Sequence, residues 1–226
     1  ASIDLPTLQR DPDLVAHSEF AKLYDQSRFA DALALADRTH FAPVNSIELA
    51  RLAELMASAG REEAAALAEK LRPLEATEAD AIVAKLRLRQ GRDAEAMAAL
   101  ERAFIRYRSD PWPDSDIMGH ALDTALTLVR SDKRFAPRVY ELLSVPFTTG
   151  QWTDAEKIYR IHVAHAAWGC GVQTIAALHA MEPNFPWASD LLAVRRKCYR
   201  GDEQRNAERD WRAITPRSLS GSFSGR

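Results

Sequence analysis

Apolar residues recur at intervals of three or four through most of this chain, which is the spacing of amphipathic helices. The clearest case is the stretch from Thr77 to Asp110, where a turn at Gly91-Arg92 separates two such segments. Thr77 with Asp80 predicts a capping-box start for the first helix, and Gly91 suits the positive φ of a chain that leaves it. The second helix carries its apolar face at Ala96, Leu100, Ala103, Phe104 and Tyr107. This stretch therefore predicts a helical hairpin with apolar faces to bury.

Two similar hairpins precede this one. The first spans about residues 13–39, and the second begins after a helix cap at Asn45 and ends at Leu71. The turn positions Ser27, Gly60 and Gly91 lie 33 and 31 residues apart, and such a period is typical of helical repeats. A single hairpin cannot cover both of its apolar faces, so the period predicts hairpins stacked on one another.

The regular period ends at Pro111-Trp112-Pro113, because two prolines interrupt a helix. We expect Trp112 to pack over the preceding hairpin. Asp114 or Ser115 then caps a further helix, and Thr153 with Glu156 predicts a second capping box. The chain is accordingly divided into N-terminal helical repeats (1–110), irregular C-terminal helical repeats (111–214) and a flexible tail (215–226).

The second helix of the clearest hairpin resembles that of a tetratricopeptide repeat. The turn glycine, the small residue, the large apolar residue and the second small residue of that family correspond to Gly91, Ala96, Leu100 and Ala103, while Asp93 stands where the family has an aromatic residue. The resemblance implies an all-α fold, in which antiparallel helix hairpins form a right-handed superhelical stack, or α-solenoid. It also implies a non-catalytic scaffold that binds a peptide or partner domain in a concave groove.

In such a stack the first helix of each hairpin faces the groove, so the resemblance also implies which residues line it. The candidate binding residues are His17, Tyr24, Glu54, Lys85, Leu88 and Arg89. Lys85 and Arg89 lie one helical turn apart, where they could hold an acidic peptide. We expect a protein or peptide partner and no nucleic acid, because the basic residues near the C-terminus alternate with acidic ones and no aromatic platform accompanies them.

A second resemblance is to the C-terminal helical region of bacterial fused spermidine-synthase-like proteins. It is carried by Pro111-Trp112-Pro113, Glu182-Pro183, Pro186-Trp187 and Arg196-Lys197-Cys198-Tyr199-Arg200. This resemblance implies an alternative function, an accessory helical domain of a larger enzyme. A third, purely structural hypothesis places Trp112, Trp152, Trp168 and Trp187 at a seam against another domain or subunit.

The composition is that of a soluble globular protein, with 46% hydrophobic and 27% charged residues in a chain of 226. No apolar run approaches the roughly 18 to 20 residues of a membrane-spanning helix, so we expect no membrane span and a cytoplasmic location. The chain begins Ala1-Ser2-Ile3 without a methionine or an apolar signal region, which fits either a processed chain or a fragment of a longer one.

No motif for catalysis is apparent, because the chain lacks GxSxG, GxxxxGK and GxGxxG. We therefore expect no enzyme activity and no cofactor. The histidines and the cysteine at His162, His165, Cys170 and His179 have a composition suited to zinc, but their spacing matches neither HExxH nor paired CxxC, so we expect no metal. Cys170 and Cys198 are either separate small apolar residues or one disulfide, and the disulfide requires an oxidising compartment.

Overall fold

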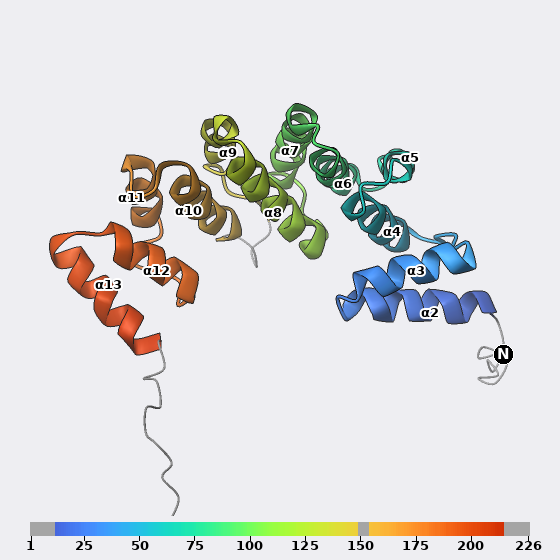
Figure 1. Ribbon diagram of the computed structural model, residues 1–226, viewed down its shortest axis with the longest axis horizontal. Helices are drawn as coiled ribbons and strands as arrows, with labels where there is room; N and C mark the ends of the chain where they lie inside the picture. Colours follow the sequence, from blue (N-terminus) through green and yellow to red (C-terminus); the bar gives the residue numbers. More distant parts are fainter. Residues whose placement is uncertain (1–11, 149–153, 215–226) are drawn as a thin grey trace, which may run out of the picture. The chain divides into compact units, whose positions relative to one another are not determined.

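The computed structural model describes residues 12–148 and 154–214, and within these ranges it is helical and contains no strand (Figure 1). The predicted all-α class is therefore confirmed. None of the described helices combines the length and the apolar character that crossing a membrane requires. The elements in chain order are α2 (Pro12–Asp25), α3 (Phe29–Thr39), α4 (Ser46–Ser58), α5 (Glu63–Leu71), α6 (Ala76–Arg89), α7 (Asp93–Tyr107), α8 (Ser115–Ser131), the 3₁₀ turn η1 (Lys133–Phe135), α9 (Ala136–Leu142), α10 (Ala155–Trp168), α11 (Val172–His179), α12 (Ser189–Cys198) and α13 (Gly201–Ile214).

The chain folds as two compact units, and the division between them falls inside α8, between Ala125 and Leu126. This division lies further along the chain than the boundary expected at the proline segment. We call the part up to Ala125 the first unit and the part from Leu126 the second unit, and describe each by itself.

In the first unit, α2 packs against α3, α4 against α5 and α6 against α7, while α4 also contacts α6. The three turns that join these pairs have left-handed backbones, with φ of 57° at Ser27, 73° at Gly60 and 71° at Gly91. Glycine adopts this conformation without a steric cost, whereas Ser27 reaches it as a non-glycine residue. The three hairpins and their turn positions are thus as the sequence predicted.

Small residues bring α6 and α7 together. Ala84 on α6 and Ala96 and Ala103 on α7 are fully buried, and residues without long side chains allow helix axes to approach closely. Around the first hairpin the core continues onto α4, in a cluster of buried residues made of Phe20, Leu23, Tyr24, Ala32, Leu35, Ala36, Leu52 and Leu55.

The predicted cap at Asn45 is present. Its side-chain oxygen accepts a hydrogen bond of 2.8 Å from the backbone N–H of Glu48, and the Glu48 carboxylate accepts one of 3.0 Å from the backbone of Val44. The first bond satisfies a donor that the first turn of α4 would otherwise leave without a partner, and the second ties the residue before the cap to that turn.

The predicted capping box of Thr77 and Asp80 is wrong. The helix α6 begins at Ala76 without a side-chain cap, and the Thr77 hydroxyl instead donates a 2.7 Å hydrogen bond to Asp110. Asp80 is fully buried, and its carboxylate pairs with three guanidinium groups, those of Arg72 at 2.8 Å, Arg102 at 3.1 Å and Arg106 at 3.6 Å. Asp80 therefore joins the end of α5 to α6 and α7 instead of capping a helix.

The expectation that Trp112 packs over the preceding hairpin is also wrong, since its side chain is 87% exposed. Two acidic side chains fix the backbone on either side of the ring. The Asp110 carboxylate accepts a 3.1 Å bond from the Trp112 N–H, and the Asp114 carboxylate accepts bonds from Asp116 and Ile117 at the start of α8. The segment is thus held by its backbone, which leaves the indole free of the core.

The second unit contains three helices of ten residues or fewer, α9, α11 and α12, beside the longer α10 and α13. In it α10 packs against α9, α11 and α12, and α12 packs against α13. Arg195 connects α12 to two other segments, with ion pairs of 2.8 Å to Glu182 and 2.7 Å to Asp210. Of the second predicted capping box, Thr153 lies outside the described residues. Glu156 is buried near the start of α10, and burial raises its pKa to about 7.

Candidate functional site

The first unit contains a carboxylate, Glu54 on α4, whose side chain is almost completely buried at 2% exposure. Its Oε1 atom accepts a hydrogen bond of 2.9 Å from the Lys85 ammonium on α6 and lies 2.6 Å from Nδ1 of His120 on α8. Its Oε2 atom accepts a 2.5 Å bond from the Tyr24 hydroxyl on α2. Four helices therefore converge on one carboxylate, and we call these four residues the Glu54 cluster.

The partners of Glu54 keep it ionised. Burial raises the pKa of a carboxyl group, but the hydrogen bond from His120, the positive charge of Lys85 and the Tyr24 hydroxyl outweigh burial here and bring the pKa of Glu54 to about 2. The same hydrogen bond raises the pKa of His120 above its ordinary value. Burial and the nearby carboxylate raise the pKa of Tyr24, which stays a neutral hydrogen-bond donor.

Aromatic and cationic side chains surround the cluster. The Tyr24 ring has the Arg51 guanidinium 4.6 Å from its centroid, and it meets Phe29 edge-on at 5.3 Å. Phe29 also meets the His120 ring at 6.2 Å. Such contacts hold both rings in the orientation that their hydrogen bonds to Glu54 require.

Three of the six candidate binding residues, Tyr24, Glu54 and Lys85, therefore meet in this cluster. The others lie elsewhere. His17 pairs with Glu48 at 2.9 Å, Leu88 is half-buried and Arg89 is exposed. Because Lys85 already neutralises Glu54, a role in holding an acidic peptide would require that ion pair to open.

Sequence reasoning missed His120, the fourth member of the cluster. It lies 66 residues after Glu54, beyond the proline segment. The sequence of its helix shows only that His120 lies near the apolar positions Ile117 and Ala121. A local pattern gives no signal for a pair that forms across such a distance.

The Glu54 cluster is suited to fixing helices in place and poorly suited to catalysis. Each carboxylate oxygen is engaged by donors of this chain, and the group is ionised and held out of solvent. A general acid or base needs a pKa near the working pH and access to a substrate, and Glu54 has neither.

A cavity of about 330 Å³ lies near the start of α4 and α6 in the same unit. It is lined by Ser46, Ile47, Ala50, Glu75, Glu78, Trp112 and Asp114. Ile47 and Trp112 contribute exposed apolar surface, at 58% and 87%, and three of the lining residues are acidic while none is basic. We call this hollow the acidic cavity.

Glu78 is the most deeply placed of these acids, at 2% exposure. One of its oxygens accepts a 2.9 Å hydrogen bond from the Asp114 backbone, and the other has no hydrogen-bond partner among the described residues. Burial raises the pKa of Glu78, and the negative charges of Asp110 and Glu75 raise it further. A positively charged group in the cavity would favour the ionised form of this carboxyl group.

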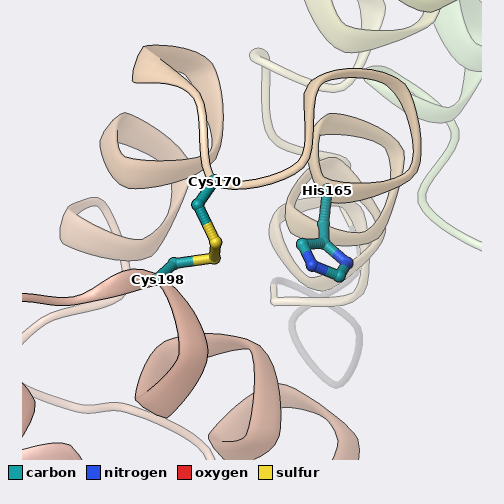
Figure 2. A group of neighbouring side chains, drawn as sticks. All are labelled: His165, Cys170 and Cys198. Atoms are coloured by element: carbon teal, nitrogen blue, oxygen red, sulfur yellow. A yellow bond between two sulfur atoms is a disulfide. The ribbon is translucent and has the colours of Figure 1, made fainter.

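In the second unit, Cys170 and Cys198 form a disulfide that joins the α10–α11 loop to the end of α12 (Figure 2). Of the two alternatives that the sequence left open for these cysteines, the structure has the paired one. The imidazole of His165, on the last turn of α10, lies beside the two sulfur atoms. Burial, together with the charges of Lys197 and His162, lowers the pKa of His165.

The other two histidines of the cluster considered in the sequence have different partners. His162 pairs with Asp190 at 3.2 Å, and His179 pairs with Glu203 at 3.1 Å. The sequence grouping of His162, His165, Cys170 and His179 is thus replaced by a smaller group that includes Cys198.

Comparison of the chain with protein-family models, with curated proteins and with solved structures found no match.

Proposed function

We propose that this chain is a non-catalytic protein-interaction scaffold, in which the hairpins of the first unit stack in the right-handed manner of tetratricopeptide-like repeats. Three pairwise-packed hairpins with left-handed turns at a regular spacing support this proposal. The contact between α4 and α6, the first helices of successive hairpins, is the contact that a stack requires.

The acidic cavity is the binding site in this proposal, and its occupant is a peptide segment that carries a Lys or Arg side chain next to an apolar one. Charge complementarity supports this choice, because Glu75, Glu78 and Asp114 line the cavity without a basic residue. The exposed Trp112 ring offers a face for the cation and Ile47 offers an apolar contact. The segment belongs either to a separate partner or, in the accessory-domain alternative, to an adjoining part of a longer chain.

The observation that carries the proposal is the exposure of Trp112. The Trp112 side chain is 87% exposed and lines the same cavity as a carboxylate with an unpaired oxygen. This combination is typical of a binding surface, since aromatic residues are enriched where partners bind. The second exposed tryptophan, Trp187 on the other unit, is 64% exposed and does not line the acidic cavity. It therefore provides a matched control.

Calorimetric titration with two synthetic peptides tests this function. One peptide alternates Arg and Leu, and the other has Glu in place of each Arg. We expect the basic peptide alone to bind, and Trp112→Ala to weaken its binding by about 30-fold, the loss that corresponds to a 2 kcal/mol interface residue. Trp187→Ala should leave the affinity unchanged. Equal binding of both peptides, or an unchanged affinity in Trp112→Ala, would refute the assignment.

The oxidation state of the two cysteines bears on the compartment in which the protein resides. A persistent disulfide is typical of proteins in oxidising compartments, so the Cys170–Cys198 bond argues against the cytoplasmic location expected from the sequence. Addition of an alkylating reagent during cell lysis distinguishes a reducing from an oxidising compartment. Both cysteines of a cytoplasmic chain would be alkylated, whereas the disulfide would protect them.

A further inference from the structure

Three side chains that can ligate a transition metal converge in the second unit. The ligand atoms of His165, Cys170 and Cys198 all lie within 4.8 Å of one another. They come from the last turn of α10, from the loop before α11 and from the end of α12 (Figure 2). Once the disulfide between the two cysteines is reduced, one imidazole and two thiols form a zinc-binding donor set.

The backbone that carries Cys170 is fixed independently of the disulfide. The Gly169 N–H donates a 3.0 Å bond to the His165 carbonyl, and the Gly171 N–H donates a 3.1 Å bond to the Trp168 carbonyl. The Thr174 hydroxyl adds a 2.7 Å bond to the Gly169 carbonyl. These bonds tie the loop to α10 and α11, so opening the disulfide leaves Cys170 close to His165.

Packing also keeps the other two groups in place. Cys198 is 3% exposed, in a core cluster with Leu191 and Leu192 of its own helix and Ile161 of α10. His165 lies one turn after Ile161, and its neighbour Ala164 is fully buried. Apolar contacts that do not involve sulfur therefore hold α10 and α12 together.

One atom of this group lacks a partner. The Nε2 atom of His165 is buried, and no described residue hydrogen-bonds to it. Buried polar atoms usually have a partner, so this unpaired nitrogen, on a ring beside two sulfur atoms, is available as a metal ligand. The nearby histidines do not compete for this role, since His162 pairs with Asp190 and His179 with Glu203.

We propose that, once the disulfide is reduced, Cys170, Cys198 and His165 bind one zinc ion and leave its fourth position to water or an external ligand. A phosphine reductant supplies the two electrons: it takes the oxygen of one water molecule to become a phosphine oxide, and the two protons of that water complete the two thiols. Binding of Zn²⁺ then releases the two thiol protons, and the two thiolates balance the charge of the ion. The disulfide and the zinc complex are thus alternative states of the same three residues.

The dimensions allow this complex to form with small movements. Zinc lies about 2.3 Å from sulfur and about 2.0 Å from imidazole nitrogen, so ligand atoms around one ion are about 3.5 to 4 Å apart. The three ligand atoms are already within 4.8 Å of one another. Rotation of the two short cysteine side chains after the bond opens therefore suffices to surround an ion.

The test uses the whole chain in its two redox states. Protein treated with tris(carboxyethyl)phosphine and untreated oxidised protein are each titrated with ZnCl₂ in a calorimeter, and parallel samples receive CoCl₂ for absorption spectroscopy. We expect one Zn²⁺ per reduced chain and none per oxidised chain. With cobalt, the reduced chain should show thiolate-to-metal charge-transfer bands and the intense visible bands of a tetrahedral site.

Variants assign the ligands. His165→Ala should weaken zinc binding by the reduced chain at least tenfold, because even the loss of an outer-shell partner typically costs about 10- to 100-fold. His179→Ala, at an exposed histidine of the same unit, is the matched control and should bind as the original chain does. Circular dichroism of each reduced protein checks that the helices persist.

Three outcomes would overturn the proposal. They are the absence of zinc binding by the reduced original chain, equal binding by the oxidised chain, and an unchanged affinity in His165→Ala. The first comparison requires no variant, so a substitution that fails to fold does not prevent the test.

Discussion

The two units of this protein fix their helices by different means. In the first unit, buried carboxylates collect positive or hydrogen-bonding groups from several helices: Glu54 receives Tyr24, Lys85 and His120, and Asp80 receives three arginines. In the second unit a covalent bond between Cys170 and Cys198 ties the α10–α11 loop to α12. The Glu54 link responds to pH, and the disulfide responds to reductants.

This difference shows two ways in which contacts between helices can be stabilised beyond apolar packing. A buried ion pair contributes little net stability, because desolvation offsets attraction, but removal of one member leaves an uncompensated charge and is costly. A disulfide acts chiefly by restricting the unfolded chain. The first unit therefore depends on the completeness of its clusters, whereas the second has a covalent link in addition to the ion pairs of Arg195.

The largest expected effect follows from removing the central carboxylate. Glu54→Ala leaves Lys85 and His120 without their shared counter-ion, and breaking a buried pair in this way costs about 3–5 kcal/mol. We expect the free energy of unfolding of the first unit to fall by this amount in urea titrations followed by circular dichroism. Glu19→Ala, which removes an exposed carboxylate on α2, is the control. A loss no larger than that of the control would contradict the role of Glu54.

The disulfide should rank next. Its sequence separation of 28 residues corresponds to a stabilisation of about 3.5 kcal/mol in the chain-entropy description. The double variant Cys170→Ser/Cys198→Ser should lower the stability of the second unit by this amount, and amide exchange in α2 to α7 should not change. Equal acceleration of exchange in both units would show that the disulfide does not act locally.

Acid should weaken the first unit selectively. The pKa of Glu54 is about 2 in the folded chain, below that of an exposed glutamate. The stabilisation is therefore present above pH 4.5 and is lost as the pH falls toward 2, by about 3 kcal/mol. His120 has the opposite dependence, because its raised pKa gives stabilisation that is lost as the pH rises through the folded value. Denaturant midpoints measured between pH 2 and 9 report both pH dependences. In Glu54→Gln, the fall of the midpoint toward low pH and its fall toward high pH should both become smaller.

The smallest expected effect concerns one hydroxyl group. Tyr24→Phe removes a donor to the buried Glu54 and should destabilise the first unit by about 1–2 kcal/mol. Tyr140→Phe removes an exposed hydroxyl that donates to the Gln173 carbonyl, where water can replace it, so its effect should be only a few tenths of a kcal/mol. Similar losses in the two variants would mean that the Glu54 cluster does not depend on its full set of donors.

Local patterns predicted the helices and turns of the first unit well. The three left-handed turns at Ser27, Gly60 and Gly91 could be found because glycine and small polar residues at a fixed period have a direct backbone meaning. The Asn45 cap could also be predicted, since its partner Glu48 lies only three residues away.

Long-range polar contacts account for the errors. Thr77 and Asp80 have the spacing of a cap, but Asp80 pairs with Arg72, just after α5, and with two arginines of α7. Tertiary ion pairs therefore occupy the carboxylate that the local pattern assigned to the cap. Of the Glu54 cluster, the repeat resemblance placed Tyr24, Glu54 and Lys85 on a common face. It could not supply His120, which lies after the proline segment, or the pairing of two cysteines, because neither leaves a periodic trace in the sequence.

The most direct test of the two-unit account is hydrogen exchange, recorded helix by helix on the unaltered protein in three conditions: oxidised at pH 6, reduced at pH 6, and oxidised at pH 3. We expect reduction to accelerate exchange in α11 and α12 alone, and acid to accelerate exchange first in α2, α4 and α6, because local opening follows the local link that is lost. If either treatment accelerated exchange in all of these helices together, the claim that the two units are stabilised separately would be contradicted.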